Sequence, residues 1–338
     1  MKPYLALFRA GPKSLHLHAV ENIGAQEFDY ALSYFGDDVP PADGAVFVHY
    51  QKGPKWPGLS RTLAAHWDTI QQYEYVWFPD DDLLCPPDQV SRMFSICKQF
   101  KLDLAQPALT HDSYFTHVAT LQHKQFSVRF ANFVEIMAPV FSVGFLARVS
   151  NTFSENLSGY GLDALWPRLS KLGKVAMIDD VTIKHTRPVG GDNYTFNHDA
   201  GVPAWMEDWF CSASYFIESP SDHHIMFGGV LQSGNTVAMG GGLQDINSLL
   251  RELIASISAA PVSPFQLTRY LSNHLTFWRG GDYGSPRYTR DLIPAVLNRE
   301  LAHTGLKFSC VGENVPGLGA ALRQNTRLPD GFGEFGGL

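Results

Sequence analysis

The 338-residue chain has few charged residues, four cysteines and no long apolar run. Charged side chains make up 17% of it and hydrophobic residues 45%, which excludes global disorder and allows a large core. The cysteines are scattered and include no CxxC pair, so neither a zinc site nor a disulfide framework is indicated, and we expect reduced thiols. No window holds 18 apolar residues, so we expect no transmembrane helix.

Basic tracts are missing as well, and the formal net charge is -7. We therefore expect no nucleic-acid partner. An anionic small ligand stays compatible with this charge, because a bound cation reverses the local sign of a site. We expect a cytoplasmic protein. Peripheral attachment to the inner face of a membrane and assembly into a homodimer stay open.

The chain does contain a regular alternation of strand and helix patterns. Short apolar segments predict strands at 3–10, 27–34, 45–50, 75–79, 104–107, 126–142, 175–178 and 181–185. Apolar stripes at helical spacing predict helices at 59–72 and 87–100 and within 156–172. This alternation is typical of an α/β fold with a mostly parallel sheet flanked by helices. We place the end of this unit near residue 205.

Residues 206–338 differ in character and predict an α-rich C-terminal extension. A hairpin pattern covers 222–239, with its turn at Ser233-Gly234-Asn235. Amphipathic patterns predict helices at 243–257, 266–278 and 293–301, and the tail is rich in glycine. The role of this extension stays open.

Three consecutive aspartates, Asp80-Asp81-Asp82, follow the aromatic strand pattern YEYVWFP. Adjacent carboxylates repel one another and lose hydration when they are buried. Parallel sheets bind ligands at the carboxyl ends of their strands, where a Mn²⁺ or Mg²⁺ ion would offset this repulsion and hold phosphates. In an extended segment Asp80 and Asp82 share a face and Asp81 points away. An exposed turn or a helix N-cap is the alternative explanation.

Two other stretches carry charge in informative places. Lys52-Gly53-Pro54-Lys55 precedes a predicted helix that contains Arg61, and lysine at a helix N-terminus can hold a diphosphate. A solvated surface turn explains the same residues. Glu135 lies within an apolar run, where an unpaired carboxylate is costly, so we expect it to face a cleft as an acceptor ligand or a base.

Six ordered sequence blocks resemble the DUF707 family, whose members are regarded as glycosyltransferases of the GT-A fold. These blocks are KGPKWPGLSR (52–61), YEYVWFPDDDL (73–83), LAQPAL (104–109), RFANFVEIMAPVFS (129–142), GYGLDALWP (159–167) and IDDVTIKH (178–185). The second block is also similar to the DxD segment of nucleotide-sugar transferases. The resemblance does not extend to the C-terminal third of the chain.

The resemblance implies that residues 1–205 form a GT-A-like, Rossmann-type domain that binds a nucleotide sugar and is catalytic. The activity would be a Mn²⁺- or Mg²⁺-dependent transfer, with inversion, from a UDP- or GDP-linked donor to a hydroxyl of a glycan or lipid-linked glycan. The resemblance implies metal ligation by Asp80, Asp82 and His185. It implies donor binding by a further set of residues, which comprises Arg9, Lys52, Lys55, Arg61, Asp80 and Asp81.

The turn from Gly159 to Asp163 lies where inverting GT-A enzymes often carry a catalytic carboxylate. Asp163 would take the proton of the acceptor hydroxyl, and Glu135 is the second candidate base. Asp163 is also well placed to cap the helix that follows. Two other functions stay open. One is a nucleotidyltransferase or phosphohydrolase, for which Asp179-Asp180 would complete a two-metal site. The other is a sugar-binding module without turnover.

Overall fold

The computed structural model describes residues 1–188, 193–207, 224–279 and 292–309. Cys211, Cys310 and the glycine-rich tail fall outside these ranges. The strands are β1 (Tyr4–Ala10), β2 (Phe28–Tyr34), β3 (Val48–Tyr50), β4 (Tyr75–Trp77), β5 (Leu83–Leu84), β6 (Leu104–Leu109), β7 (Phe126–Ala131), β8 (Val140–Ser142), β9 (Val175–His185), β10 (Met226–Leu231) and β11 (Thr236–Ala238). The α-helices are α1 (His16–Ala19), α2 (Lys55–Ile70), α3 (Pro87–Phe100), α4 (Val143–Val149), α5 (Leu162–Leu169), α6 (Asn193–Ala200), α8 (Leu243–Ile257), α9 (Pro264–Trp278) and α10 (Ile293–Glu300).

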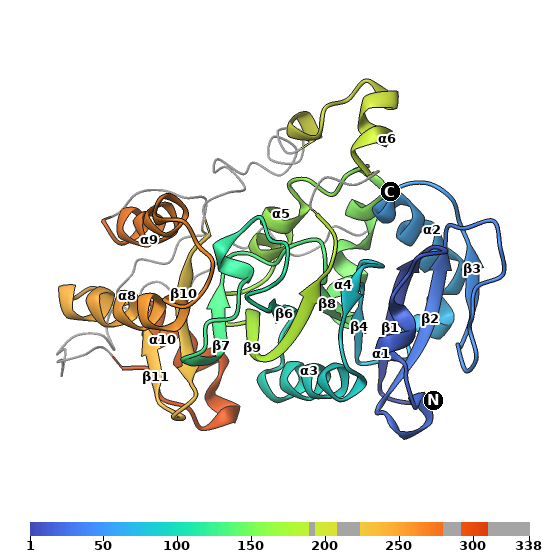
Figure 1. Cartoon of the computed structure of the whole chain (residues 1–338). Coiled ribbons are helices and arrows are strands. Elements are labelled where there is room, and N and C mark those ends of the chain that lie inside the picture. Colours follow the sequence, from blue (N-terminus) through green and yellow to red (C-terminus); the bar gives the residue numbers. More distant parts are fainter. Residues whose placement is uncertain (189–192, 208–223, 280–291, 310–338) are drawn as a thin grey trace, which may run out of the picture.

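The described strands form a central sheet in the order β11-β10-β7-β9-β6-β8-β4-β1-β2-β3 (Figure 1). Strands β1, β2, β3, β4, β6, β9 and β10 run in one direction, and β7, β8 and β11 run in the other. The short β5 pairs with the end of β9. The fold is therefore α/β with a large, mostly parallel sheet flanked by helices, which confirms the predicted class.

Strand β1 is buried on both faces of the sheet, as expected for a strand inside a two-sided α/β layer. Its residues alternate between two hydrophobic cores. Tyr4, Ala6 and Phe8 join the core that contains α3, whereas Leu5 and Leu7 join the core that contains α2, α4 and α5. This period of two is the pleat of the strand, and it positions helices on both sides of the sheet.

Several predicted elements have different bounds in the structure. The strand predicted at 126–142 is two strands, β7 and β8, separated by residues 132–139. Helix α2 begins at Lys55, four residues earlier than predicted. Pro57 is tolerated in its first turn, because proline lacks an N–H group and the N–H groups of a first turn have no partner within the helix. Residues 175–185 form a single strand, although we predicted two strands separated by Asp179-Asp180. The register between β6 and β9 shifts at this point, and the chain continues in the same direction.

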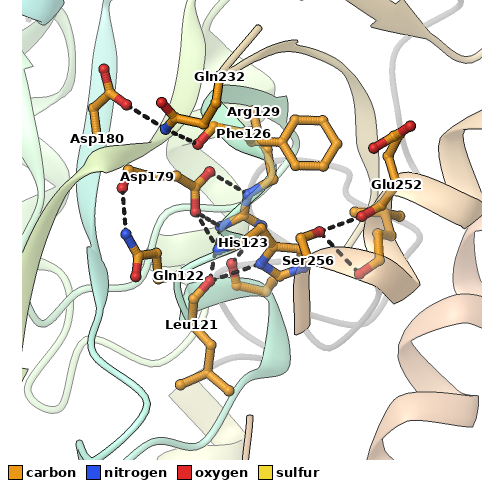
Figure 2. Close-up of polar contacts among 12 residues, drawn as sticks. Leu121, Gln122, His123, Phe126, Arg129, Asp179, Asp180, Gln232, Glu252 and Ser256 are labelled. Carbon is orange, nitrogen blue, oxygen red and sulfur yellow. Dashed lines mark hydrogen bonds and ion pairs between the residues drawn. The ribbon is translucent and has the colours of Figure 1, made fainter. Parts of the chain in front are cut away.

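A buried ion pair explains how β9 accommodates a carboxylate in its interior. Arg129 of β7 donates to both oxygens of Asp179, at 2.7 and 3.0 Å, and both side chains are buried (Figure 2). The remaining guanidinium hydrogens reach the carbonyls of Ala119 and Leu121, and the His123 amide donates to Asp179. Because every charge is compensated, the aspartate stays within the strand.

The predicted hairpin is confirmed as β10 and β11, and β10 pairs with β7. The hairpin therefore continues the central sheet. Helices α8 and α10 bury Ile246, Leu249 and Leu297 in the same core as α3. The boundary at residue 205 stays a prediction. None of the helices in the described ranges is both long and apolar enough to cross a membrane.

Candidate functional site

The three aspartates lie directly beyond the carboxyl end of β4. The chain continues there in an extended form, because the amides of Phe78 and Asp80 donate to the carbonyls of Pro139 and Met137, both at 2.9 Å. Strand β5 then pairs with the end of β9, which sets Leu83 opposite His185. The carboxyl ends of β4 and β9 and the segment that precedes β8 therefore meet at one edge of the sheet.

Asp82 and His185 face each other at this edge. The His185 Nε2 and Asp82 Oδ2 atoms are 3.2 Å apart, while Nδ1 is 2.9 Å from the carbonyl of Tyr114. A carbonyl only accepts, so Nδ1 carries a proton, and Nε2 donates a second proton to the Asp82 carboxylate when no cation is bound. A bound cation would take the place of the proton on Nε2. Burial lowers the pKa of His185, but the hydrogen bond and charge of Asp82 outweigh it and raise that pKa above its ordinary value.

The second oxygen of Asp82 makes this pair suited to a cation. Oδ1 is buried and has no hydrogen-bond partner among the described residues. A carboxylate and a neutral imidazole whose other nitrogen is fixed by a carbonyl are suitable ligands for Mn²⁺, with open positions left for water or phosphate. The pair therefore fits the predicted ion. The described residues form no group of three or more histidine, cysteine or acidic side chains arranged to hold a metal.

Asp80 is paired within the protein by Lys55. The Nζ atom of Lys55 is 2.5 Å from Asp80 Oδ1 and also contacts the carbonyls of Phe78, Ile136 and Met137, at 3.1, 2.7 and 3.1 Å. Burial raises the pKa of Asp80, and the charge of Lys55 opposes this rise. The ammonium has three hydrogens for four acceptors, so its donors are all used by protein groups. Its predicted contact with a donor diphosphate stays untested.

Asp81 and Asp82 lie in a turn and not in the extended segment that we predicted, and Asp81 pairs with a different residue from Asp80 and Asp82. The Asp81 Oδ1 atom is 3.0 Å from Arg187 Nη1 in a partly buried ion pair. Burial raises the pKa of Asp81 to about 6, and the charge of Arg187 opposes this rise.

Glu135 lies within electrostatic reach of Asp80, and Gln106 is hydrogen-bonded to Glu135. Glu135 is half-buried, and its Oε2 is one of the buried atoms without a hydrogen-bond partner in the described part of the chain. Burial raises the pKa of Glu135 to about 7; His185 and Lys55 oppose the rise, and Asp80 adds to it. Gln106, fully buried on β6, accepts the Glu135 amide at 2.7 Å. The only signal for Gln106 in the sequence was a polar residue inside the strand pattern LAQPAL.

Arg9, Lys52 and Arg61 gather around the turn before α2. Arg9 is buried and donates to the Gly53 carbonyl at 2.7 Å and to Ser33. Burial and the charge of Arg61 lower the pKa of Arg9 to about 10, and Asp81 opposes this. Lys52 is exposed and paired with an exposed aspartate, Asp37. The three cations therefore form a second group beside the aspartates.

Asp163 lies in the first turn of α5, but it does not cap that helix. The N-cap is Gly161, and Asp163 Oδ1 accepts the amide of Ala164 at 2.9 Å. The alternative that Asp163 is the N-cap is therefore wrong, although a carboxylate in the first turn still stabilises the helix dipole. The turn packs closely against Trp56, because a Cβ atom at Gly159 would lie 2.5 Å from Trp56 Nε1.

Comparisons with known proteins give a family and distant structural similarities. The structure is similar to the crystal structure of S. aureus TarS 1-349 in complex with UDP-GlcNAc, with 12% identity, coverage of 90% of this chain and 88% of the other, and a TM-score of 0.41. The crystal structure of S. aureus TarS 1-349 gives 9% identity, 84% and 93% coverage and a TM-score of 0.40. These similarities are too distant to assign an activity. No curated protein matches the chain. The model of the family described as "Protein of unknown function (DUF707)" matches residues 27–199, and the chain belongs to that family.

Proposed function

We propose that this protein is a metal-dependent glycosyltransferase that uses a nucleotide-sugar donor. The observation that carries the proposal is the pair formed by Asp82 and His185 at the carboxyl end of β4, with Asp82 Oδ1 unpartnered among the described residues. This is the edge at which open α/β sheets bind ligands. The DxD-like segment that supplies Asp82 favours a nucleotide sugar as the ligand.

Each residue of the site would have a separate task. Asp82 and His185 would hold Mn²⁺ or Mg²⁺, and Asp80, kept charged by Lys55, would orient water molecules around the ion or the ribose. The bound ion would neutralise the diphosphate as it leaves the sugar. Arg9 lies within electrostatic reach of both Arg61 and Asp81, and the two arginines would add positive charge for the UDP or GDP part of the donor. A glycan hydroxyl would be the acceptor.

Transfer with inversion requires a base, and Glu135 is favoured over Asp163. Glu135 lies within electrostatic reach of Asp80, Lys55 and His185, and its raised pKa, about 7, suits proton transfer near neutral pH. Asp163 is engaged by the Ala164 amide at the start of α5. It stays a candidate because the Gly159 turn packs against Trp56, next to Lys55.

The contacts of Asp179 and Asp180 disfavour the alternative function that requires two metal ions. A nucleotidyltransferase or phosphohydrolase of that kind would recruit Asp179 and Asp180 as further ligands. Asp179 is enclosed in the buried pair with Arg129, and Asp180 contacts Arg92 at 2.7 Å and Gln232 at 2.7 Å. Neither carboxylate is therefore free to approach Asp82.

Nucleotide release from a panel of UDP- and GDP-sugars, measured with and without Mn²⁺, tests the proposal. We expect Mn²⁺-dependent release from at least one donor, and loss of that release in Asp82→Asn. Asp112→Asn is the matched control, because Asp112 pairs with Lys184 at the exposed surface. Release that is independent of the metal, or a fully active Asp82→Asn variant, would contradict the proposal. Binding without any release would point to a sugar-binding module.

A further inference from the structure

Gln106 is a polar side chain in the interior of the sheet whose amide nitrogen has no assigned task. It lies on β6 between β8 and β9, and none of its surface is exposed. Its neighbours on the strand are apolar and buried, so packing alone would favour another apolar residue here. A buried amide needs partners for both its oxygen and its nitrogen.

The orientation of this amide follows from its hydrogen bond to the backbone. The Glu135 amide donates to Gln106 at 2.7 Å, and a backbone N–H can only bond to the oxygen of the side-chain amide. The nitrogen, Nε2, is therefore fixed on the other side of the amide. It is a donor with no acceptor within the described part of the chain.

Glu135 supplies the complementary atom. Its Oε2 is a buried acceptor that likewise lacks a donor in the described ranges. The Glu135 carboxylate lies within electrostatic reach of His185, Asp80 and Lys55, the residues of the candidate metal site and its counter-ion. An unpartnered donor and an unpartnered acceptor therefore belong to two residues that are joined by a hydrogen bond, beside that site.

We propose that Gln106 Nε2 and Glu135 Oε2 form the subsite for the acceptor hydroxyl. A hydroxyl is the group that matches both atoms at once, since its oxygen accepts from the amide and its hydrogen donates to the carboxylate. A phosphate or carboxylate would be repelled by Glu135, and a cation would be repelled by the amide hydrogens. This inference rests on the proposed function and adds Gln106 as a substrate-binding residue.

This arrangement would support transfer of the sugar in a single displacement step. The acceptor hydroxyl gives its proton to Glu135 Oε2 while its oxygen forms a bond to the anomeric carbon of the donor sugar. The bond between that carbon and the diphosphate oxygen breaks, and its electron pair leaves with the nucleoside diphosphate. Gln106 holds the attacking oxygen through Nε2 and keeps its lone pair directed at the sugar.

Variants separate this role from donor binding. We expect Glu135→Gln to lower turnover by about 10²–10⁴-fold and Gln106→Leu by about 10²-fold. The Kd for the same nucleotide sugar with Mn²⁺ should stay within about threefold, because the donor does not contact these two atoms. Gln106→Met keeps most of the side-chain volume and removes the donor without adding a charge, so it covers the case in which the leucine variant does not fold. Gln232→Leu, which removes an amide donor at the distant hairpin, should behave like the wild type.

Hydrolysis of the donor, with water as the acceptor, provides the turnover assay without a known glycan. Unchanged turnover in Gln106→Leu and Gln106→Met would overturn the proposal. A weaker Kd for the nucleotide sugar with an unchanged Kd for the free nucleotide would also overturn it, because the two atoms would then bind a hydroxyl of the donor sugar.

A high-resolution crystal structure decides the question even if no donor is turned over, in which case the proposed function fails separately. We expect an ordered water molecule within hydrogen-bond distance of both Gln106 Nε2 and Glu135 Oε2. A direct bond between the two side chains, or a protein partner for each, would overturn the subsite.

Discussion

Substitution of Lys55 by methionine tests whether this residue is an internal counter-ion. The side chain is 6% exposed, and its ammonium contacts Asp80 and three backbone carbonyls at 2.5 to 3.1 Å. Methionine keeps the length of the side chain and removes the charge and every hydrogen bond. The contacts tie α2 to the end of β4 and to the segment before β8, so their loss should weaken the whole site.

The expected cost follows from the burial of the two partners. Removal of one member of a buried ion pair costs about 3–5 kcal/mol, because the other charge is left uncompensated. The Asp80 side chain is 32% exposed and water can reach it again, which favours the lower end of this range. We therefore expect the free energy of unfolding to fall by about 3 kcal/mol.

Urea denaturation followed by circular dichroism measures this change, and Lys52→Met is the matched control. Lys52 is 65% exposed and paired with an exposed partner, so its loss should change stability by about 0.5 kcal/mol or less. Equal unfolding midpoints for the two variants would refute the counter-ion role. If Lys55→Met lost only its affinity for nucleotide, the diphosphate contact implied by the family resemblance would be the better explanation.

Three further predictions concern the metal pair of Asp82 and His185, the buried ion pair of Asp179 and Arg129, and the buried side chain of His274. Asp82→Asn should abolish Mn²⁺ binding in calorimetry, whereas His185→Ala should weaken it less, because a neutral ligand contributes less than a carboxylate to a hard cation; a stronger effect of His185→Ala would contradict the assignment. Asp179→Asn should lower the free energy of unfolding by about 3–5 kcal/mol, since Arg129 stays buried without a charged partner, and an unchanged urea midpoint would contradict this. Burial lowers the pKa of His274 from 6.5 to about 4. Between these two pH values the His274 side chain binds a proton in the unfolded chain but not in the folded protein. The contribution of His274 to the free energy of unfolding is therefore fully present above pH 6.5, and it falls by about 1.4 kcal/mol for each pH unit as the pH drops. His274→Gln should reduce that slope in unfolding measured from pH 7 to 4.5, and an identical slope would exclude His274 as a source of it.

The fold class and most elements could be predicted because they follow from local periodicity. The apolar stripe Val90, Met93, Phe94 and Cys97 predicted α3 with its observed bounds, and all four residues are buried. The single strand through Asp179 could not be predicted, because the charge that permits it comes from Arg129, fifty residues away in the chain. An acidic pair in a sequence reads as a break in a strand until its partner is known.

The candidate site could be predicted only in part, because some of its contacts join residues that are distant in the sequence. Asp82 was a candidate from its residue type and position and His185 from the family resemblance, and the pairing of β5 with β9 brings them together. Lys55 was predicted to face a ligand, but its ammonium is surrounded by carbonyls that only the folded chain assembles. Gln106 gave no recognisable pattern, because its importance depends on the Glu135 amide that fixes its orientation.

Anomalous diffraction from crystals soaked with MnCl₂ and UDP tests the central claim most directly. We predict a manganese peak between Asp82 and His185, within about 2.5 Å of a carboxylate oxygen and of Nε2, with the diphosphate oxygens completing the coordination. A manganese peak only at another place in the molecule, or nucleotide bound away from the carboxyl end of β4, would contradict the account.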